Sequence, residues 1–160
     1  MSLAHPVLGE MIPVRHGAAP RGWAFAHGQL MTVASMPPLF ELIGYTFGGH
    51  DTVFALPNLP VLESGLAYAI ALIGTEPIDT IPTDQVLGQL YPFKGGAAPR
   101  GWTPADGELL PVSSNQALYS VLLNTFGGGR AATFGTPKLP PVNEGALIYD
   151  LALEGTYPTA

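Results

Sequence analysis

The sequence predicts an α+β protein built from two tandem, small, β-rich modules, each with one short helix and much irregular loop. Three observations predict this class. The chain repeats itself, each copy holds one segment with helical hydrophobic spacing, and 20 glycines and 17 prolines leave room only for short elements. A module of about eighty residues buries only about 60% of its unfolded surface. We therefore expect the two copies to pack on each other or on partners.

The repeat is clearest around the one tryptophan of each copy. The segment Pro20-Arg21-Gly22-Trp23 returns 79 residues later as Pro99-Arg100-Gly101-Trp102. Thr46-Phe47-Gly48-Gly49 returns at the same spacing as Thr125-Phe126-Gly127-Gly128, after which the second copy gains one residue. The resulting division is a first module at 1–75, a linker rich in Pro and Thr at 76–84 and a second module at 85–160.

The strands of one module are expected in the following order. Residues 8–14 alternate weakly and include Pro13, which is typical of an edge strand. Residues 23–26 and 29–32 flank His27-Gly28 and predict a tight hairpin, and the second copy has the stronger turn signal Asp106-Gly107 at this place. Residues 66–73 predict a buried strand at the end of the module.

A single helix is expected in the middle of each module. Apolar residues fall at helical spacing from Leu39 to Phe47, with Ser35 as the predicted N-cap, Pro37 in the first turn and Gly48 as the stop. The second copy repeats the pattern between Ser114 and Gly127. A glycine loop should follow, and then an extended segment at 54–60, because each proline disfavours helical conformation in the residue before it.

Charged residues are scarce. Only 11% of the chain is Asp, Glu, Lys or Arg, against about 25% in a typical soluble domain. Either the surface is plain and loop-rich, or much of it is buried in an oligomer, and the low charge favours the oligomer. A net charge of −6 with six cationic side chains argues against nucleic acid and against anionic membrane surfaces as partners.

The sequence also argues against cysteine chemistry, a secretory signal peptide and a membrane-spanning segment. The chain has no cysteine, which removes disulfides and thiol catalysis. Its first residues lack the pattern of a secretory signal peptide, and the longest apolar run, 66–73, is too short to cross a bilayer.

The histidines are candidates for a metal site, but they could also be ordinary loop residues. His5, His16, His27 and His50 all lie in the first copy. His27, His50 and Asp51 are either a transition-metal site or solvent-facing loop residues, and the second copy, which does not keep the set, favours the loops. No metal or cofactor is therefore predicted.

The candidates for catalysis and phosphate binding also have structural roles as alternatives. Glu63 and Glu144 are either an acid–base pair or turn and interface residues, and the second role is favoured. Residues 126–130 resemble a phosphate loop only faintly, since the Lys-Ser/Thr of that motif is missing. No catalytic residue is predicted.

The residues kept in both copies are mainly those of turns and cores. Trp23 and Trp102 are expected to be core anchors, with sugar stacking as the alternative. Arg21 and Arg100 precede them and are expected to stack or to bind carbonyls, with partner docking as the alternative. Gly28 and Gly107 complete this structural motif in the following turn.

These motifs together resemble the phage tail collar domain, and more closely its short bacterial relatives, the microcystin-dependent proteins. The matching run in each copy is Ala-Pro-Arg-Gly-Trp, then Gly-Gln/Glu-Leu, a short helix, Thr-Phe-Gly-Gly and a Pro-x-Leu segment. The Gly-Arg that commonly follows Pro-x-Leu is replaced by Pro60-Val61 and Pro140-Pro141, which puts any fibre-specific strand beyond that point in doubt. The resemblance implies a place in phage tails, tail fibres or tail-like extracellular particles, contact with host surfaces and no catalytic residues.

Three functions follow from these observations, in order of preference. The first is a non-enzymatic structural and attachment component that assembles with itself or with homologous collar-domain proteins, helped by strand addition at exposed sheet edges and by an extended arm at 1–6. The second is a glycan-binding adhesin module. The third and most remote is a polysaccharide hydrolase. The residues expected to form ligand or partner loops are Gly49, His50, Asp51, Gly128, Gly129 and Arg130.

Overall fold

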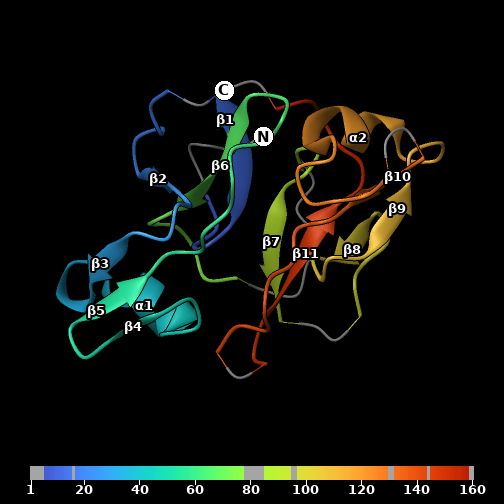
Figure 1. The fold of residues 1–160 in the computed structure, drawn as a ribbon. Coiled ribbons are helices and arrows are strands. Elements are labelled where there is room, and N and C mark those ends of the chain that lie inside the picture. Colours follow the sequence, from blue (N-terminus) through green and yellow to red (C-terminus); the bar gives the residue numbers. More distant parts are fainter. Residues whose placement is uncertain are drawn as a thin grey trace.

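The fold is given by a computed structural model that describes residues 6–15, 17–77, 85–94, 97–129, 132–143 and 145–158. Each copy has one seven-residue helix among short strands, which confirms the predicted α+β class (Figure 1). The first copy contains β1 (Met11–Arg15), β2 (Trp23–Phe25), β3 (Leu30–Thr32), the 3-10 turn η1 (Val33–Ser35), α1 (Pro37–Ile43), β4 (Gly49–His50), β5 (Val53–Ala55) and β6 (Leu66–Ala71). The second contains β7 (Leu90–Phe93), β8 (Trp102–Pro104), β9 (Leu109–Pro111), α2 (Gln116–Leu122), β10 (Thr133–Gly135) and β11 (Ile148–Ala152).

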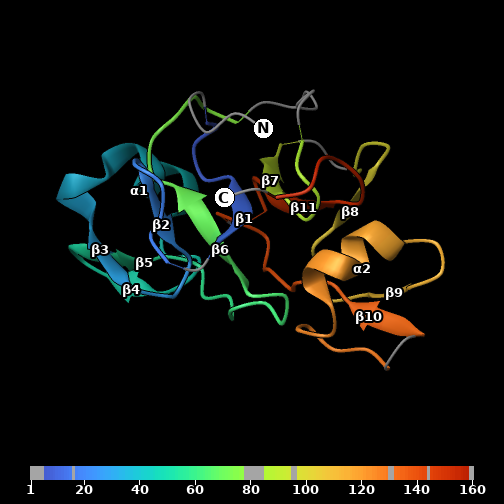
Figure 2. The ribbon, with the colours of Figure 1, turned by 90° about the horizontal axis from the view of Figure 1, so that it is seen from above.

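One antiparallel sheet runs through both copies. Its order is β2-β6-β1-β7-β11-β8, so that three strands of each copy join at the central pair β1–β7 (Figures 1 and 2). This pair meets at Met11 and Leu90, which are equivalent residues of the repeat. The two copies are therefore related by an approximate two-fold axis at this point, and they pack on each other.

The main core lies on one face of this sheet and is shared by the copies. Leu39 and Leu42 of α1 belong to the same buried cluster as Leu118 and Val121 of α2. The opposite face holds two separate, smaller clusters, one around Trp23 and one around Trp102. A core shared in this way solves the problem of a module too small to be stable alone.

The prediction that residues 8–14 form an edge strand is wrong. β1 lies in the middle of the six-stranded sheet, with β6 on one side and β7 on the other. Pro13 is tolerated there because Tyr68, its neighbour in β6, directs its carbonyl away to Ala26, so that Pro13 and Tyr68 do not exchange hydrogen bonds. The proline nitrogen faces the side on which β7 pairs only at Met11.

The predicted hairpin across His27-Gly28 is also absent. β2 pairs with β6 in the large sheet, whereas β3 pairs with β5 in a separate three-stranded sheet of order β3-β5-β4. The second copy behaves in the same way, with β8 on β11 and β9 on β10. The glycine turn thus moves the chain from one sheet to another, because more distant strands occupy the edges that the hairpin would have used.

The helices are confirmed in position and corrected at their ends. Pro37 begins α1, as predicted, but the N-cap is Met36 without a side-chain hydrogen bond, and Ser35 belongs to η1. The helix ends at Gly44, one turn before Gly48, because Gly44 turns the chain at a φ of 54°. The predicted strand at 66–73 is confirmed as β6, which ends two residues earlier, at Ala71. Most of the predicted linker, 78–84, lies outside the described residues, as do His5, His16 and most of the arm at 1–6.

Candidate functional site

The Arg-Gly-Trp segments form equivalent turns at the two ends of the large sheet. The amide N–H of Trp23 donates to the carbonyl of Pro20 at 2.9 Å, and Trp102 donates to Pro99 at 3.0 Å. Both indoles are buried, whereas Arg21 and Arg100 are exposed. Within the described residues, neither guanidinium has a hydrogen bond or an ion pair. The two arginines are thus open to solvent or to a partner.

The environments of the two tryptophans differ. The Trp102 Nε1–H is buried and has no acceptor within the described residues. Asp150 lies on the same sheet face, where the first copy has Ala69, and burial raises the pKa of its carboxyl to about 6. Burial and the negative charge of Glu10 raise the pKa of Tyr91 to about 12. The second copy therefore carries more buried polar groups than the first.

Gly28 and Gly107 hold the turns that connect the two kinds of sheet. Their φ angles are 78° and 83°, a region that L side chains rarely adopt. A Cβ at Gly28 would also lie 3.0 Å from the side chain of Asn58, and one at Gly107 would lie 3.2 Å from Lys138. Glycine is kept at both places for these two reasons.

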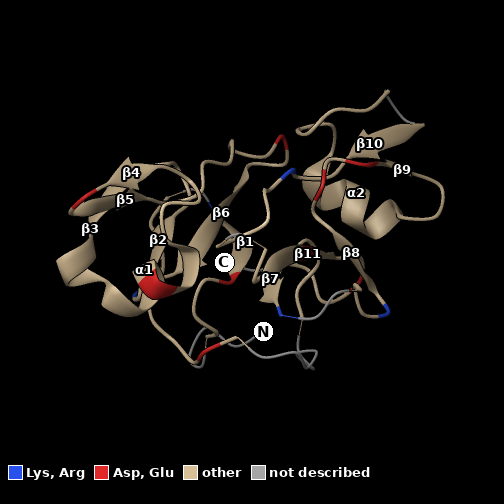
Figure 3. Cartoon of the chain, turned by 90° about the horizontal axis from the view of Figure 1, so that it is seen from below, with Lys and Arg blue, Asp and Glu red and all other residues tan. Residues whose placement is uncertain are grey.

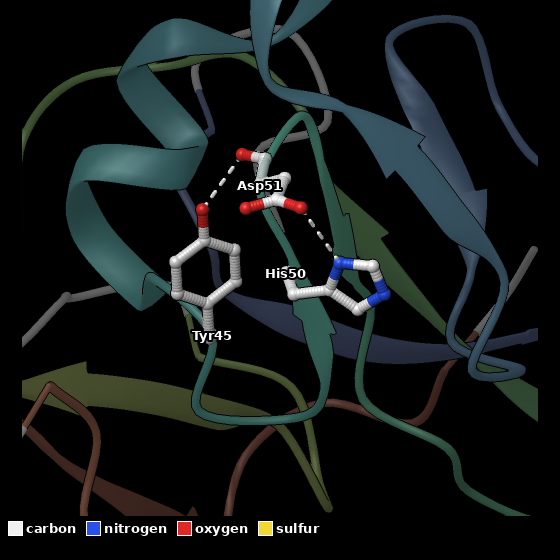
Figure 4. Close-up of polar contacts among 3 residues, drawn as sticks. All are labelled: Tyr45, His50 and Asp51. Atoms are coloured by element: carbon white, nitrogen blue, oxygen red, sulfur yellow. Dashed lines mark hydrogen bonds and ion pairs between the residues drawn. The ribbon is translucent and has the colours of Figure 1, made fainter.

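The predicted ligand loop of the first copy is the tip of the β4–β5 hairpin. Gly49 pairs with Phe54 so closely that a Cβ would lie 2.5 Å from the carbonyl oxygen of Val53. His50 and Asp51 project into solvent at 84% and 88% side-chain exposure, with 3.3 Å between Nδ1 and Oδ2. Figure 4 shows the imidazole and the Tyr45 hydroxyl, which donates to the Asp51 carbonyl at 2.7 Å, on the two sides of Asp51.

The corresponding loop of the second copy is only partly described. Gly128 makes the same close approach as Gly49, since a Cβ there would lie 2.5 Å from the Thr133 carbonyl oxygen. The exposed Gly129 donates its N–H to the Thr133 hydroxyl at 3.0 Å. Arg130 lies outside the described residues.

The structure brings together only two of the three candidate metal ligands, His27, His50 and Asp51. His50 and Asp51 are neighbours. His27 instead stacks on Phe25 with 5.5 Å between ring centroids, and its backbone forms an isolated β-bridge with Asn58. Among the described residues, no group of three His, Cys, Asp or Glu side chains could hold a metal ion. Glu144 lies outside the described residues, so the structure does not test whether it pairs with Glu63.

Glu63 has a structural partner instead. Its amide N–H donates to the Thr125 hydroxyl at 2.8 Å, and its carboxylate accepts from the Asn124 N–H at 3.1 Å. The loop of one copy thus closes the C-terminal end of the helix of the other. The reciprocal contact joins Asn143 to the end of α1, where its N–H donates to the Thr46 hydroxyl at 3.0 Å and its side-chain amide to the Glu41 carbonyl at 3.1 Å.

An open groove lies beside this second contact and was not predicted from the sequence. It has a volume of about 560 Å³ and is lined by Phe40, Glu41, Gly44, Tyr45, Thr46, Pro140, Pro141 and Asn143. The signal was present in the repeat, because Gly44 and Tyr45 correspond to Leu123 and Asn124 in the second copy. The two copies thus differ in the residues that line the groove, although the contact that frames it is shared.

Charged residues are few and scattered along the described fold, as the coloured ribbon of Figure 3 shows. Several large apolar side chains are exposed instead, among them Leu30 and Leu109, which are equivalent residues of the repeat. Within the described residues, none of the helices combines the length and the apolar character that a membrane crossing requires.

Comparison with known proteins identifies the module. The family model of the phage tail collar domain matches residues 9–61 and again residues 88–140. No curated protein and no solved structure matches the chain. The two matched regions cover most of the chain, and one lies in each copy of the repeat. The chain therefore belongs to the phage tail collar domain family and contains this domain twice.

Proposed function

We propose that the chain is a non-enzymatic structural and attachment component of a phage tail, a tail-like particle or an extracellular fibre. The family supports the tail context. The observation that supports assembly is a pair of equivalent exposed leucines, Leu30 in β3 and Leu109 in β9, which are 62% and 59% exposed. Neither residue belongs to the described core, although the repeat keeps both.

The position of these leucines suggests how subunits join. β3 and β9 each lie at the edge of a small sheet, and Figures 1 and 2 show the two sheets at opposite ends of the molecule. An exposed strand edge is a ready template for pairing with another chain. Because the edge occurs twice, one chain would bind two neighbours, either copies of itself or homologous collar-domain proteins. Repeated contacts of this kind generate rings or filaments.

Assembly is tested on the purified full-length chain by light scattering and electron microscopy. We expect a defined oligomer or filament, and we expect the double variant Leu30→Ser/Leu109→Ser to dissociate it. Ile73→Ser removes a leucine-sized exposed side chain elsewhere, at 61% exposure, and is the matched control. A clean monomer at high concentration would overturn the assembly part of the proposal.

A second function, binding of cell-surface glycan, is favoured by the exposed β4–β5 loop and the neighbouring groove, and it is compatible with the first. A glycan array probed with the oligomeric chain tests it. The remote alternative is a hydrolase of surface polysaccharide, which a screen of polysaccharides for released reducing ends would detect.

A further inference from the structure

The groove at the C-terminal end of α1 continues into a second hollow. This second hollow, of about 260 Å³, is lined by Glu41, Leu42, Glu76, Lys94, Asn143, Ala146 and Leu147. Glu41 and Asn143 line both hollows, so the two are adjacent parts of one groove. We call this set of residues the interdomain groove. Two adjacent hollows suit an extended ligand better than a compact one.

Both copies build the interdomain groove. One wall is the C-terminal end of α1 with Gly44 and Tyr45, and the other is the segment 140–143 of the second copy. The two hydrogen bonds from Asn143 to Thr46 and Glu41 fix the walls relative to each other. The groove therefore exists before any ligand binds, which lowers the entropic cost of binding.

The equivalent place in the second copy shows what is particular to this groove. Leu123 stands where the groove has Gly44, and both take the same backbone conformation, with φ of 49° and 54°. Asn124 replaces Tyr45, and its side-chain amide is fully used by the carbonyls of Gly127 and Thr133, both at 3.1 Å. Among the described residues, the open floor and the aromatic ring thus belong to the first copy and are missing at the equivalent place of the second.

The groove of the first copy is also more acidic than the equivalent place in the second copy. Ser120 and Tyr157 of the second copy hydrogen-bond to each other at 2.5 Å. The first copy has Glu41 and Glu76 at these positions, both exposed and both lining the groove, with Lys94 nearby. A closed polar contact in one copy is therefore replaced by two carboxylates that have no partner among the described residues of the other.

The chemistry of this lining favours a saccharide. The Tyr45 ring is 44% exposed, and it is held by its hydroxyl bond to Asp51 and by edge-on packing against Phe40 at 5.0 Å between centroids. A fixed, half-exposed ring offers a flat apolar face to sugar C–H groups, and carboxylates accept hydrogen bonds from sugar hydroxyls. A protein partner is less suited, because charged residues are depleted at the centre of protein interfaces and Glu41 lies at the centre of this groove.

We propose that the interdomain groove binds an oligosaccharide of neutral or amino sugars, with Tyr45 as the stacking platform and Glu41 as a hydroxyl acceptor. Two carboxylates against one ammonium disfavour acidic sugars. The proposal rests on the attachment part of the proposed function and deepens it by naming a site and a ligand class.

The test uses the full chain on an array of neutral, amino and acidic oligosaccharides, followed by titration of the best neutral or amino hit. In the isotope-labelled protein we expect that hit to shift the amide signals of residues 40–46 and 142–143. Tyr45→Asn and Gly44→Leu introduce the residues of the second copy, and each should weaken binding at least about tenfold. Tyr45→Phe loses the hydroxyl bond to Asp51 but keeps the ring and its edge-on packing against Phe40, and it should retain most of the binding.

The matched control is Tyr157→Asn, which removes another exposed tyrosine, at 56% exposure, in the second copy. It should bind like the unaltered chain, and melting curves of all variants confirm that they fold. An array without neutral or amino hits, or a hit whose signals shift elsewhere, overturns the proposal. If Tyr45→Asn dissociates the oligomer, the groove is a subunit contact and the proposal is wrong. If the unaltered chain is a monomer yet binds sugar in the groove, the saccharide site stands and the assembly proposal fails.

Discussion

The side-chain amide of Gln89 donates a hydrogen bond of 2.5 Å to the carboxylate of Glu10, its own counterpart in the repeat. The remaining acceptors of this pair are used symmetrically. The Val7 N–H donates to Glu10 at 2.6 Å, and the Val86 N–H donates to Gln89 at 2.9 Å. Both side chains are buried at the centre of the sheet. The duplicated module is therefore joined by one acid and one amide, an arrangement that two identical copies could not form.

Gln89→Glu should destabilise the protein by roughly 3 kcal/mol at pH 7.5, because two buried carboxylates would then face each other. Their repulsion raises the pKa of one carboxyl in the folded state. The folded protein then takes up a proton, so stability should be regained as the pH falls toward 4. Urea unfolding at the two pH values measures the effect.

The exchanged pair Glu10→Gln/Gln89→Glu is the control for this prediction. It restores one acid and one amide with their positions reversed, and the two amide donors of Val7 and Val86 remain. The double variant should recover most of the stability that Gln89→Glu loses. Failure to recover would show that the approximate two-fold symmetry does not extend to the energetics of the pair.

Two buried tyrosines provide a second reciprocal link between the copies. The Tyr68 hydroxyl donates to the Gly88 carbonyl at 2.6 Å, and the Tyr149 hydroxyl donates to the Gly9 carbonyl at 2.5 Å. Tyr68→Phe and Tyr149→Phe should each cost about 1–3 kcal/mol, because each leaves a buried carbonyl without its donor. Denaturant melts measure both losses. Tyr157→Phe removes a solvent-exposed hydrogen bond to Ser120, which water can replace, and should cost clearly less than either buried change, about 0.5 kcal/mol or below.

Local patterns predicted the elements of each module, but the partners of the strands depended on the other copy. The helical spacing around Leu39 and Leu42 and the apolar run of β6 needed no distant information. Pro13 predicts an edge strand because the sequence does not show that β7, from the second copy, adds to β1 at Met11. The turn at Asp106-Gly107 predicts a hairpin that does not form for a similar reason, since β11 and β10 occupy the edges of β8 and β9. The interdomain groove could have been anticipated only by asking where the copies differ, as at Gly44 and Leu123.

Asp150 makes stability depend on pH. Burial raises its pKa from 3.8 to about 6, so the neutral carboxyl is favoured in the folded state. The folded protein then holds a proton that the unfolded chain releases, and stability should fall as the pH rises from about 4 to about 6. Asp150→Ala, which introduces the residue of the first copy, should raise the melting temperature at pH 7.5 and leave it nearly unchanged at pH 3.5. An equal gain at both pH values would attribute the effect to packing rather than to charge.

Gly49 and Gly128, the first glycines of the two predicted ligand loops, are required by close backbone contact. A methyl group at Gly49 or Gly128 would lie about 2.5 Å from neighbouring backbone atoms, at φ of 96° and 103°. Gly49→Ala and Gly128→Ala should therefore each destabilise by about 2–3 kcal/mol in thermal or urea melts. Gly17→Ala is the control, since a Cβ there meets nothing within 4 Å, and a comparable loss in Gly17→Ala would argue against the steric explanation.

Separate halves of the chain should differ in their ability to pair with themselves. A chain of residues 85–160 can rebuild the central strand pair with a second copy, because two Gln89 amides can each donate and accept. A chain of residues 1–77 would place Glu10 against Glu10, and two buried carboxylates oppose pairing until one is protonated. Sedimentation at pH 7.5 should therefore find a dimer of 85–160 but not of 1–77, and at pH 4.5 both should dimerise. Glu10→Gln in the 1–77 chain should permit pairing at both pH values. If that variant stays monomeric, the acid–amide pair does not explain why the modules join within one chain.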